Sequence, residues 1–459
     1  MTSIKEGLPL TRYPQGSLKE LWAISWPMML SALAGHLMII TDRLLLSRYS
    51  QEAFVAATAS QSWYWTFSLS LMALICITEV FVGGYNGSNQ HSEIRKVVWQ
   101  MLWASFFSWV ILLPLAFSVP LLLANNIQTL GGPYLQILFL FMPFYLAGFG
   151  AIGSFFVGRG ETKIMPIVLT TSNILNIFLD IWFIFGGWFV PSMGIAGAAY
   201  ATGISQFLGF VFFLVMFFRK RNREAFSTHK PHFSMKIMKR CFSIGIPNAF
   251  NAFVNLIGWS LIYQMLVAKT SQDQLFAYSI SYSIFVFFWF VLDGLGKGIC
   301  ATCANSLGQK NYETMGKTIG SIIKISLFFA LATSAFMVFC PDLAIFLFAD
   351  DPSLYLMEQS KNVLFWAWIA IFFECVWWGL QNMLVAAGDT RYTFLINTSS
   401  FWLVSLMPIF IFVFGKGWNP SFCWKVLTVD LLVRISLLVK RYKSEKWKNK
   451  IDLLQKIED

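Results

Sequence analysis

Long apolar stretches constrain this chain more than any other feature of its sequence. Runs of about 20 or more predominantly apolar residues recur from end to end, and a helix of that length crosses the roughly 30 Å hydrocarbon core of a bilayer. Charged residues make up only 12% of the chain, whereas an average soluble domain carries about 25%. The sequence therefore predicts an all-α polytopic membrane protein.

The hydropathy pattern predicts twelve transmembrane helices. Their expected ranges are 21–46, 56–84, 97–123, 133–157, 164–187, 193–218, 242–268, 275–306, 318–348, 361–387, 392–415 and 420–440. Aromatic residues make up 17% of the chain, which is typical of interfacial belts and apolar packing.

Basic residues predict the orientation of these helices, because cytoplasmic loops of membrane proteins carry an excess of Lys and Arg. The densest clusters are the loop 219–240 and the tail from Lys440, so we expect both termini in the cytoplasm. The net charge of +11 collects where anionic lipid headgroups would attract it. It therefore requires no nucleic-acid partner, and the lipid bilayer is the expected surrounding.

The two halves of the chain repeat each other. "LWAISWPMML" corresponds to "CFSIGIPNAF", "YNGSNQHSEI" to "SLGQKNYETM", and "GRGETK" to "AAGDTR", each pair at a similar offset. This predicts an amino-terminal six-helix lobe (1–220), a basic cytoplasmic linker (221–241) and a carboxy-terminal six-helix lobe with a basic tail (242–459). Transporters built from repeats commonly bind substrate where the repeats meet, whereas a channel, receptor or membrane enzyme has less need of twin lobes.

The fifth span carries polar residues that share one helix face: Asn173, Asn176 and Asp180. An ionised Asp at the centre of a bilayer helix costs about 2.5–3.5 kcal/mol on insertion scales, so Asp180 should face a cavity or a partner. Asp42 in the first span and Thr202 in the sixth could converge on it. The resulting oxygen ligands suit a hard cation such as Na⁺, and two nearby carboxylates could instead share a proton. The alternative is that Asp180 bonds a neighbouring helix or pairs with Arg43.

The second half offers a less regular set of polar residues. Asn248, Asn251 and Asn255 form a stripe in the seventh span that could line a cavity or tie helices together by amide hydrogen bonds. Glu374 lies in the tenth span and is a further candidate for the cavity or for a site in the second lobe.

Other charged residues within the spans have two interpretations each. Asp293 and Lys297 are spaced as an i, i+4 ion pair, which favours local neutralisation over a switch opened by protonation. Glu79 could serve an inner gate or reach the cytoplasmic interface. His36 is turned well away from the Asp42 face, which favours a packed histidine over a proton relay.

Several segments together resemble the MATE family (multidrug and toxic compound extrusion transporters). They are "SWPMML", "TDRLLLS", "GRGETKIMPIVLTTSNILNIFLDIWFIFG", "GIAGAAYATGISQ", "SIGIPNAF" and "AAGDTRYTFLIN". The resemblance spans essentially the whole chain and implies two six-helix lobes facing each other across a central cavity. It also implies export of drugs and organic cations in exchange for protons or sodium ions.

The resemblance assigns roles residue by residue. Asp42, Asn176, Asp180 and Thr202 stand where the family's amino-terminal lobe carries its cation-coupling site. Glu374 stands where some members carry a coupling acid. Those members also carry a Glu in the seventh span, where this chain has Asn255, and this departure argues against a sodium site in the second lobe.

The expected function is antiport by alternating access, in a multi-pass protein of the plasma membrane (the inner membrane if the organism is bacterial). We expect the coupling ion and no further cofactor. The expected substrates are small, organic and mainly cationic, and aromatic pairs such as Trp63 and Trp65 could hold them. The expected oligomeric state is a monomer.

Two other functions are alternatives to antiport. A flippase for a lipid-linked saccharide would line its cavity with several cations, but those within the spans are few: Arg43, Lys297, Lys324, Lys425 and Arg434. An intramembrane enzyme would need a nucleophile–base pair or a metal motif such as HExxH, and the four histidines form none: His36, His91, His229 and His232. The sequence therefore predicts no enzyme.

Overall fold

The computed structural model describes residues 9–123, 125–187, 189–346 and 353–455, and most of them are helical. The first half contains α1 (Leu18–Tyr49), α2 (Gln51–Ile75), α3 (Thr78–Gly87), α4 (His91–Phe107), α5 (Trp109–Ser118), η1 (Val119–Leu122), α6 (Asn125–Tyr145), η2 (Leu146–Ile152), α7 (Gly153–Val157), α8 (Ile164–Phe185) and α9 (Gly194–Phe217). A short helix, α10 (Lys220–Phe226), follows in the linker.

The second half contains α11 (Met235–Lys269), α12 (Gln272–Gly308), α13 (Glu313–Ser334), η3 (Ala335–Phe339), α14 (Pro341–Phe346), α15 (Leu354–Ala386), α16 (Thr390–Ser400), η4 (Phe401–Leu406), α17 (Met407–Ile409), η5 (Phe410–Gly415), α18 (Ser421–Lys443) and α19 (Lys448–Gln455). The segments η2, η3, η4 and η5 are π-helical turns that continue the helices beside them.

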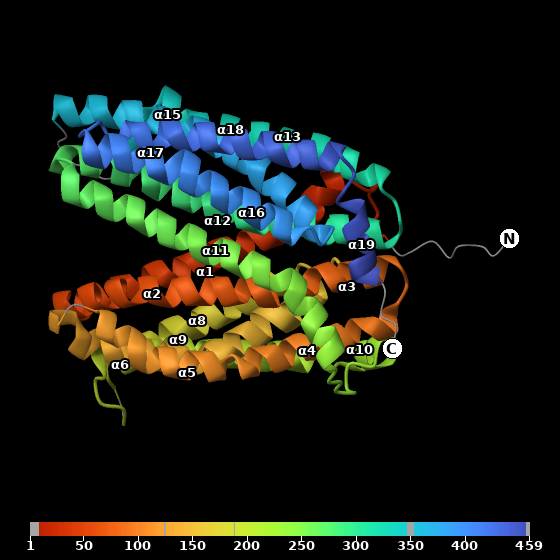
Figure 1. The fold of residues 1–459 in the computed structure, drawn as a ribbon. Coiled ribbons are helices and arrows are strands. Elements are labelled where there is room, and N and C mark those ends of the chain that lie inside the picture. The colour runs from red at the N-terminus through yellow and green to blue at the C-terminus, as the bar shows by residue number, and fades with distance from the viewer. Residues whose placement is uncertain (1–8, 124, 188, 347–352, 456–459) are drawn as a thin grey trace.

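The twelve predicted transmembrane helices are present. Eleven described helical segments are long and apolar enough to cross a membrane. The twelfth is α18, whose 23 residues include Lys425, Asp430 and Arg434, and it runs alongside α15 (Figure 1). Asp430 and Arg434 pair with each other, which offsets the cost of two charges in this helix. The second predicted span differs in one respect, because the chain between α2 and α3 forms a turn at Cys76 and Ile77.

Serine residues begin five of the long helices. Each of these serines accepts a hydrogen bond from a backbone N–H in the first turn, which satisfies a donor that has no partner inside the helix. They are Ser17, Ser50, Ser234, Ser271 and Ser353. The corresponding helices therefore start where the sequence supplies a cap.

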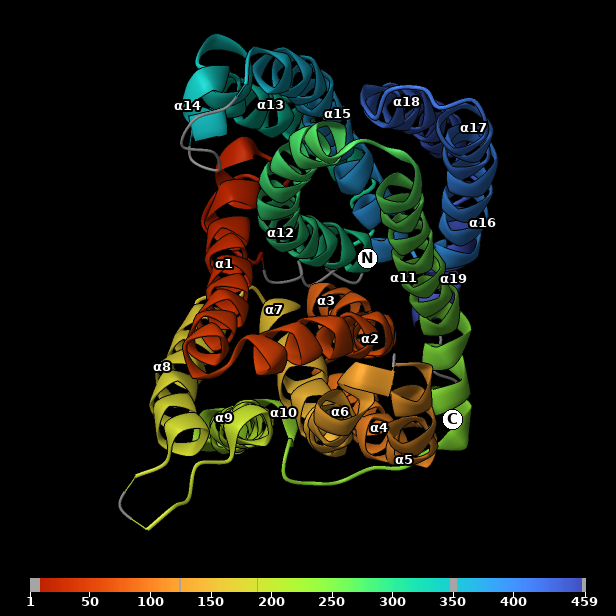
Figure 2. The same cartoon turned by 90° about the vertical axis from the view of Figure 1, so that its left-hand side faces the viewer.

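The helices form two bundles related as the repeat predicts. Figure 2, which views the molecule end-on, shows α2 to α9 in one bundle and α12 to α18 in the other. The first helix of each repeat lies at the side, and α1 and α11 flank the molecule on opposite sides. Accordingly, α1 packs against α12, and its counterpart α11 packs against α2.

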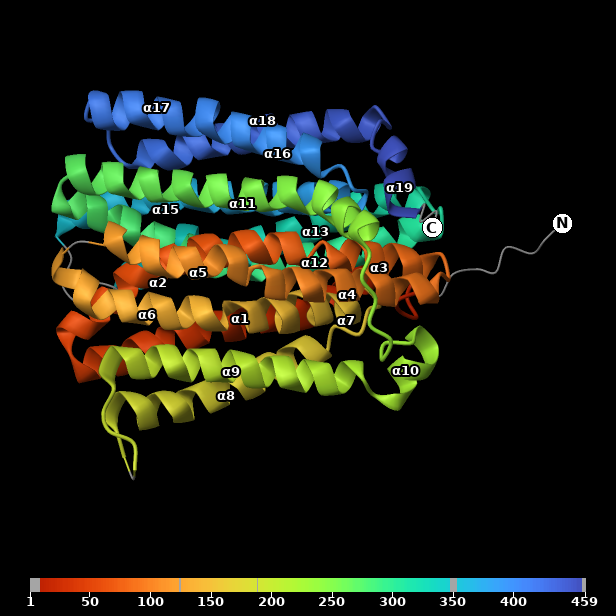
Figure 3. The ribbon, with the colours of Figure 1, turned by 60° about the horizontal axis from the view of Figure 1, so that its bottom comes forward.

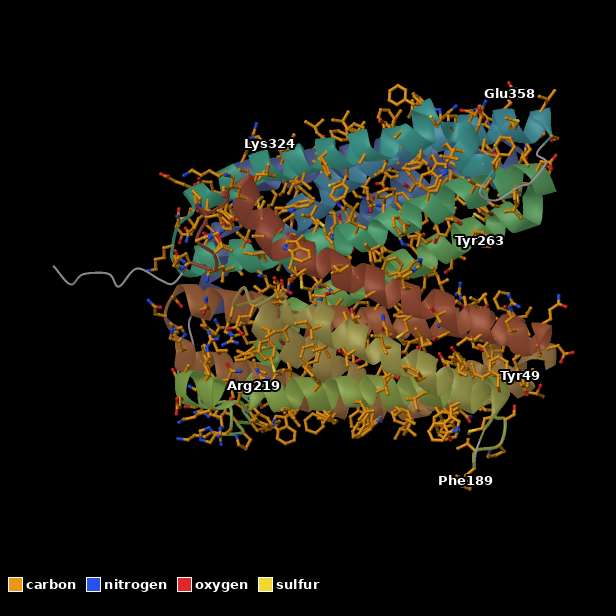
Figure 4. The ribbon with its side chains drawn as sticks, turned by 180° about the vertical axis from the view of Figure 1, so that it is seen from behind. Tyr49, Phe189, Arg219, Tyr263, Lys324 and Glu358 are labelled. Carbon is orange, nitrogen blue, oxygen red and sulfur yellow. The ribbon has the colours of Figure 1, made fainter. Side chains whose placement is uncertain are left out.

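The molecule has two distinct ends. At one end, called the α19 end here, lie α3, α10 and α19, while the connection between α8 and α9 projects from the opposite end (Figure 3). Figure 4 shows Tyr49, Phe189, Tyr263 and Glu358 at that opposite end and Arg219 at the α19 end. Successive connections thus alternate between the ends, as expected of helices that cross a membrane.

Glycines bring the two bundles into backbone contact toward the α19 end. A Cβ atom on Gly83 would lie 2.8 Å from the Cβ of Ala304, and one on Gly87 would lie 2.0 Å from the backbone oxygen of Asn305. A Cβ on Gly308 would lie 2.0 Å from the backbone oxygen of Gly84. We call this α3–α12 contact the glycine seam. Since no side chain fits between the helices, the lobes are closed at this end.

The repeated motifs "GRGETK" and "AAGDTR" make equivalent ion pairs at the α19 end. The Glu161 carboxylate accepts hydrogen bonds from Arg159 at 2.9 Å and from Arg221 at 3.2 Å. Asp389 accepts two hydrogen bonds from Arg441, at 2.6 and 3.1 Å. The Arg159 guanidinium also lies 3.9 Å from the ring centroid of Phe155, and burial lowers its pKa to about 10. Glu161 therefore binds Arg221, just after the first repeat, and Asp389 binds Arg441, near the end of the second.

Candidate functional site

A central cavity of about 540 Å³ lies between the lobes. Its walls come from α1, α2 and α3 on one side, and from α11, α12, α15, η4 and α18 on the other. Aromatic rings contribute much of the lining: Trp65, Trp259, Tyr282, Phe285, Trp289, Phe290, Trp377, Trp378, Phe401 and Trp424. This size and aromatic character suit a drug-sized organic molecule.

Most of the polar residues singled out in the sequence line this cavity. They are His36, Glu79, Asn248, Asn251, Asn255, Asp293, Lys297 and Glu374. Of the aromatic pair named there, Trp65 lines the cavity. Tyr282 lines it too, whereas Tyr278 is buried against Trp424.

The asparagine stripe of α11 lines the cavity and also ties helices together. Asn248 donates from Nδ2 to the backbone oxygen of Ala73 on α2, at 3.2 Å. Asn255 donates to the backbone oxygen of Asn251 at 2.7 Å and to its side-chain oxygen at 3.0 Å. Both interpretations of the stripe therefore describe part of its geometry.

A second polar group lies inside the first lobe, where α1, α8 and α9 meet. Asp42 and Asp180 are 3% and 0% exposed, and Thr202 donates from Oγ1 to Oδ2 of Asp42 at 3.3 Å. The two carboxyl groups lie within electrostatic range of each other. Asn176 is fully buried beside Asp180. The four residues, predicted from three separate spans, are therefore brought together.

These buried groups lack most of the hydrogen bonds that they could make. Within the part of the chain that the structure describes, one oxygen of Asp42, both oxygens of Asp180 and both polar atoms of the Asn176 amide have no partner. Asn173, one turn earlier on α8, differs because it donates to the backbone oxygen of Ala34 at 2.6 Å. Buried polar atoms are normally satisfied, so this concentration makes the group the candidate site for a proton or a small cation.

Helix α1 separates this acid pair from the central cavity. His36, Ile39 and Arg43 face the cavity, whereas Asp42 is buried on another side of the same helix. The Arg43 guanidinium donates from Nε to Gln61 at 3.3 Å, and no ion pair joins it to Asp180 among the described residues. The His36 ring lies 4.4 Å from that of Phe290, as expected of a packed histidine.

Three further buried polar residues of the first lobe were not singled out from the sequence: Tyr64, Tyr134 and Gln206. Tyr134 on α6 is buried within electrostatic range of Asp42 and Asp180. Gln206 donates from Nε2 to the hydroxyl of Tyr64 at 3.3 Å. Gln206 lies one turn after Thr202, so helical spacing could have identified it, whereas nothing in the sequence distinguishes Tyr134.

The second lobe contains an acidic site that sequence reasoning missed. Asp430 on α18 forms an ion pair with Arg434 one turn later and accepts hydrogen bonds from Ser400 and Ser405, the latter at 3.0 Å. Glu374 on α15 lies within electrostatic range of both charges. The spacing of Asp and Arg in "DLLVR" is that of a helical ion pair and could have identified it.

Aromatic rings enclose the Arg434 side chain. Its guanidinium carbon lies 5.1 Å from the ring centroid of Trp377 and 5.3 Å from that of Phe401. The indole of Trp377 donates to Asn397 at 3.0 Å, and Asn397 donates to Gln381 at 2.7 Å. The cation is thus held in place by rings that are themselves fixed by hydrogen bonds.

A third charged cluster spans the boundary between the lobes. Glu79 on α3 is 4% exposed, and on α12 the Lys297 ammonium lies 3.3 Å from Oδ2 of Asp293. All three residues line the cavity. Among the described residues, no group of three or more His, Cys, Asp or Glu side chains has the arrangement of a metal site.

Comparison with known proteins identifies the family. The MatE family model matches this chain twice, over residues 27–182 and 247–411. The two matches begin at Pro27 and Pro247, which are equivalent positions in the two repeats. The matches cover more than half of the chain.

Curated relatives match over nearly their whole length. A probable multidrug resistance protein NorM of Thermotoga maritima is 25% identical, with 97% of this chain and 96% of the relative covered. The uncharacterized transporter YisQ of Bacillus subtilis is 24% identical, with 95% and 96% covered.

Solved structures share the fold at lower sequence identity. A MOP superfamily transporter from Pyrococcus furiosus superposes with a TM-score of 0.82 at 17% identity, covering 97% of this chain and 98% of that one. The eukaryotic MATE transporter AtDTX14 gives a TM-score of 0.82 at 16% identity, covering 95% and 98%. Together with the family match, these findings show that this chain belongs to the MatE family, whose members are transporters and not enzymes.

Proposed function

We propose that this transporter exports organic cations in exchange for protons or sodium ions by alternating access. In this proposal Asp42, Asn176, Asp180 and Thr202 bind the coupling ion, and the central cavity binds the substrate. The observation that carries the proposal is the buried carboxyl pair of Asp42 and Asp180, most of whose oxygens have no donor among the described residues. Two carboxylates held together in the membrane require a positive charge to compensate them.

Helix α1 supplies the physical link between the two sites. It carries Asp42 on the side facing α8 and α9, and His36, Ile39 and Arg43 on the side facing the cavity. A cation at the acid pair removes repulsion between α1 and α8 and lets these helices repack. Because the same helix forms a wall of the cavity, repacking changes the affinity for substrate, and the coupling acts in both directions.

The proposed cycle follows from this link. The outward-facing transporter takes up a proton or Na⁺ at Asp42 and Asp180 and releases substrate. Reorientation exposes the coupling ion to the cytoplasm, where it leaves and new substrate binds. A membrane potential contributes about 2.3 kcal/mol per net charge moved per 100 mV, and it cancels if equal charges exchange one for one.

We also propose that the α19 end faces the cytoplasm and that the lobes correspond to residues 1–220 and 242–459, joined by the linker 221–241. The α19 end carries α10 and the basic last turn of α18, with Lys440, Arg441 and Lys443. This distribution supports cytoplasmic termini through the positive-inside rule. The plasma membrane and a monomeric state are the further parts of this proposal.

The cavity lining argues against a flippase for a lipid-linked saccharide. Of the described residues that line the cavity, Arg43, Lys297 and Arg434 are the cations. Lys297 is paired with Asp293 and Arg434 with Asp430, so two of these charges are already compensated by carboxylates. A pyrophosphate group would meet too little free positive charge to offset its desolvation.

Transport by purified protein in liposomes tests the proposal. Vesicles loaded with a fluorescent organic cation receive either a pH gradient or a sodium gradient, and efflux is followed for wild type and Asp180→Asn. One of the gradients should drive efflux by wild type, and Asp180→Asn should lose this response, because a single carboxylate no longer requires the coupling ion.

The matched control is Asp273→Asn, the same chemical change at an exposed position at the start of α12. It should transport as wild type does. Gradient-driven efflux by Asp180→Asn at the wild-type rate would show that the acid pair does not couple transport. No response of well-folded wild type to either gradient would contradict antiport itself.

A further inference from the structure

The charged cluster between the lobes contains one buried acid that forms no ion pair among the described residues. Glu79 of α3 is 4% exposed, lines the cavity, and its Oε1 atom has no hydrogen-bond partner among the described residues. Asp293 and Lys297 of α12 are about a third exposed, and both line the same cavity. The cluster therefore presents its charges to the space where substrate would lie.

The charges of this cluster do not balance. Two carboxyl groups share one ammonium, so one negative charge lacks a counter-charge when both are ionised. The other titratable groups facing the cluster are neutral at physiological pH: Cys76 at the end of α2, Tyr145 of α6 and Cys300 of α12. The cluster can therefore accept one further positive charge.

Aromatic rings stand beside this deficit. Trp289 lies one helical turn before Asp293 on α12, and its ring centroid is 5.7 Å from that of Trp378 on α15. Both rings line the cavity, and the indole nitrogen of Trp378 is buried without a partner in the described structure. A cation over indole rings gains about 0.5–2 kcal/mol, and the rings would also cover the apolar body of an organic cation.

We propose that Glu79 and Asp293, with Trp289 and Trp378, form a substrate subsite for monovalent organic cations in which the Lys297 ammonium is a built-in competitor for the carboxylates. This subsite rests on the proposed function and specifies its substrate class. A monovalent cation supplies the one missing charge. A divalent cation would leave one of its charges uncompensated in a poorly hydrated site, which is unfavourable.

The subsite also lies beside the seam where the two lobes meet. Glu79 belongs to α3, and Asp293 and Lys297 belong to α12, the two helices that meet in the glycine seam. In the substrate-free protein, the Lys297 ammonium is the cation that stands beside Glu79 and Asp293. A bound organic cation takes over these carboxylates and displaces the ammonium. The Lys297 ammonium thus occupies the carboxylates whenever no substrate is bound.

Equilibrium binding measures the competition directly. The full-length protein in lipid nanodiscs is titrated with tetraphenylphosphonium, a monovalent cation without hydrogen-bond donors, and quenching of tryptophan fluorescence is followed. Lys297→Met should lower the Kd at least fivefold, because the competing ammonium is gone while a side chain of similar length remains. Glu79→Gln should raise the Kd at least fivefold.

Two surface variants control for charge alone. Lys324→Met removes a cation from the exposed face of α13, and Glu52→Gln removes an acid from the exposed start of α2. Neither should change the Kd. Methyl viologen, a divalent cation, should bind wild type more weakly than tetraphenylphosphonium does.

A double variant separates local competition from the general field of the cavity. If Lys297 competes for the Glu79 carboxylate, the tighter binding produced by Lys297→Met should shrink at least threefold in the Glu79→Gln background. Equal gains in both backgrounds, or an unchanged or higher Kd for Lys297→Met alone, would overturn the subsite. The key result is a gain of affinity, which a misfolded variant would not produce.

The liposome assay keeps the two proposals distinguishable. Tighter binding by Lys297→Met, without gradient-driven efflux by wild type, would support the subsite and contradict antiport. Normal coupled efflux by wild type, with no change of Kd in Lys297→Met, would overturn the subsite and leave antiport standing.

Discussion

The ion pair of α18 should be a large single contributor to the stability of the second lobe. The Asp430 and Arg434 side chains are only 1% and 5% exposed, and the carboxylate accepts hydrogen bonds from Arg434, Ser400 and Ser405. Removing one partner of a buried pair leaves the other charge uncompensated and costs about 3–5 kcal/mol. Asp430→Asn should therefore destabilise the protein by about this amount.

The structure explains why the loss of stability in Asp430→Asn should fall in the upper part of that range. The Nε atom of Arg434 is already buried without a partner among the described residues, and Asn at position 430 would supply only one acceptor oxygen. Changing both residues, Asp430→Asn with Arg434→Met, removes both charges and lets the Met side chain pack between Trp377 and Phe401. Neutral replacement of a buried ion pair is often close to energetically neutral, so the double variant should recover most of the stability.

An exposed ion pair in the same lobe provides the matched control. Lys361 lies 2.7 Å from Asp342, but the two side chains are 44% and 48% exposed. Exposed pairs contribute about 0.2–1 kcal/mol, so Asp342→Asn should lower stability several times less than Asp430→Asn.

Thermal unfolding followed by intrinsic fluorescence, with the same detergent and lipid for every variant, compares them. The double-mutant cycle should give a coupling of at least about 2 kcal/mol between Asp430 and Arg434. The reasoning is refuted if Asp430→Asn unfolds at the same temperature as Asp342→Asn, or if the double variant is less stable than each single variant.

Two further predictions concern the glycine seam and the acid pair. Gly87→Ala should reduce transport severely, because its Cβ would lie 2.0 Å from the backbone oxygen of Asn305 and overpacking costs about 1–3 kcal/mol in the closed state. The control in the same efflux assay is Gly84→Ala, whose Cβ meets nothing nearer than 3.9 Å. Equal transport rates of the two variants would disprove the steric argument. Thr202→Val should shift the coupling-ion concentration for half-maximal transport about tenfold, because the hydrogen bond to Asp42 is lost. Thr202→Ser should retain the wild-type value. An unshifted Thr202→Val variant would show that this hydroxyl does not act on the coupling ion.

The sequence was sufficient for the twelve helices and their repeat. A membrane helix is identified by the hydropathy of about 20 neighbouring residues, so the local sequence is enough to predict it. The repeated motifs at Glu161 and Asp389 mark equivalent positions in the two halves. Helical periodicity and the cost of an intramembrane acid also selected Asn176 and Asp180, while the family resemblance added roles for Asp42 and Thr202. The structure brings these four residues together, and their role in coupling stays a prediction.

Only the tertiary structure decided which side of each helix meets which neighbour. It buried Asp42 away from the cavity that Arg43 lines, although the two residues are adjacent in the chain. It also brought Glu79 within range of Lys297, more than 200 residues later, across a seam where glycines let two backbones touch. The physical reason is that hydropathy depends on composition within one helix, whereas a site between helices depends on rotation and packing that residues far apart in the chain determine together.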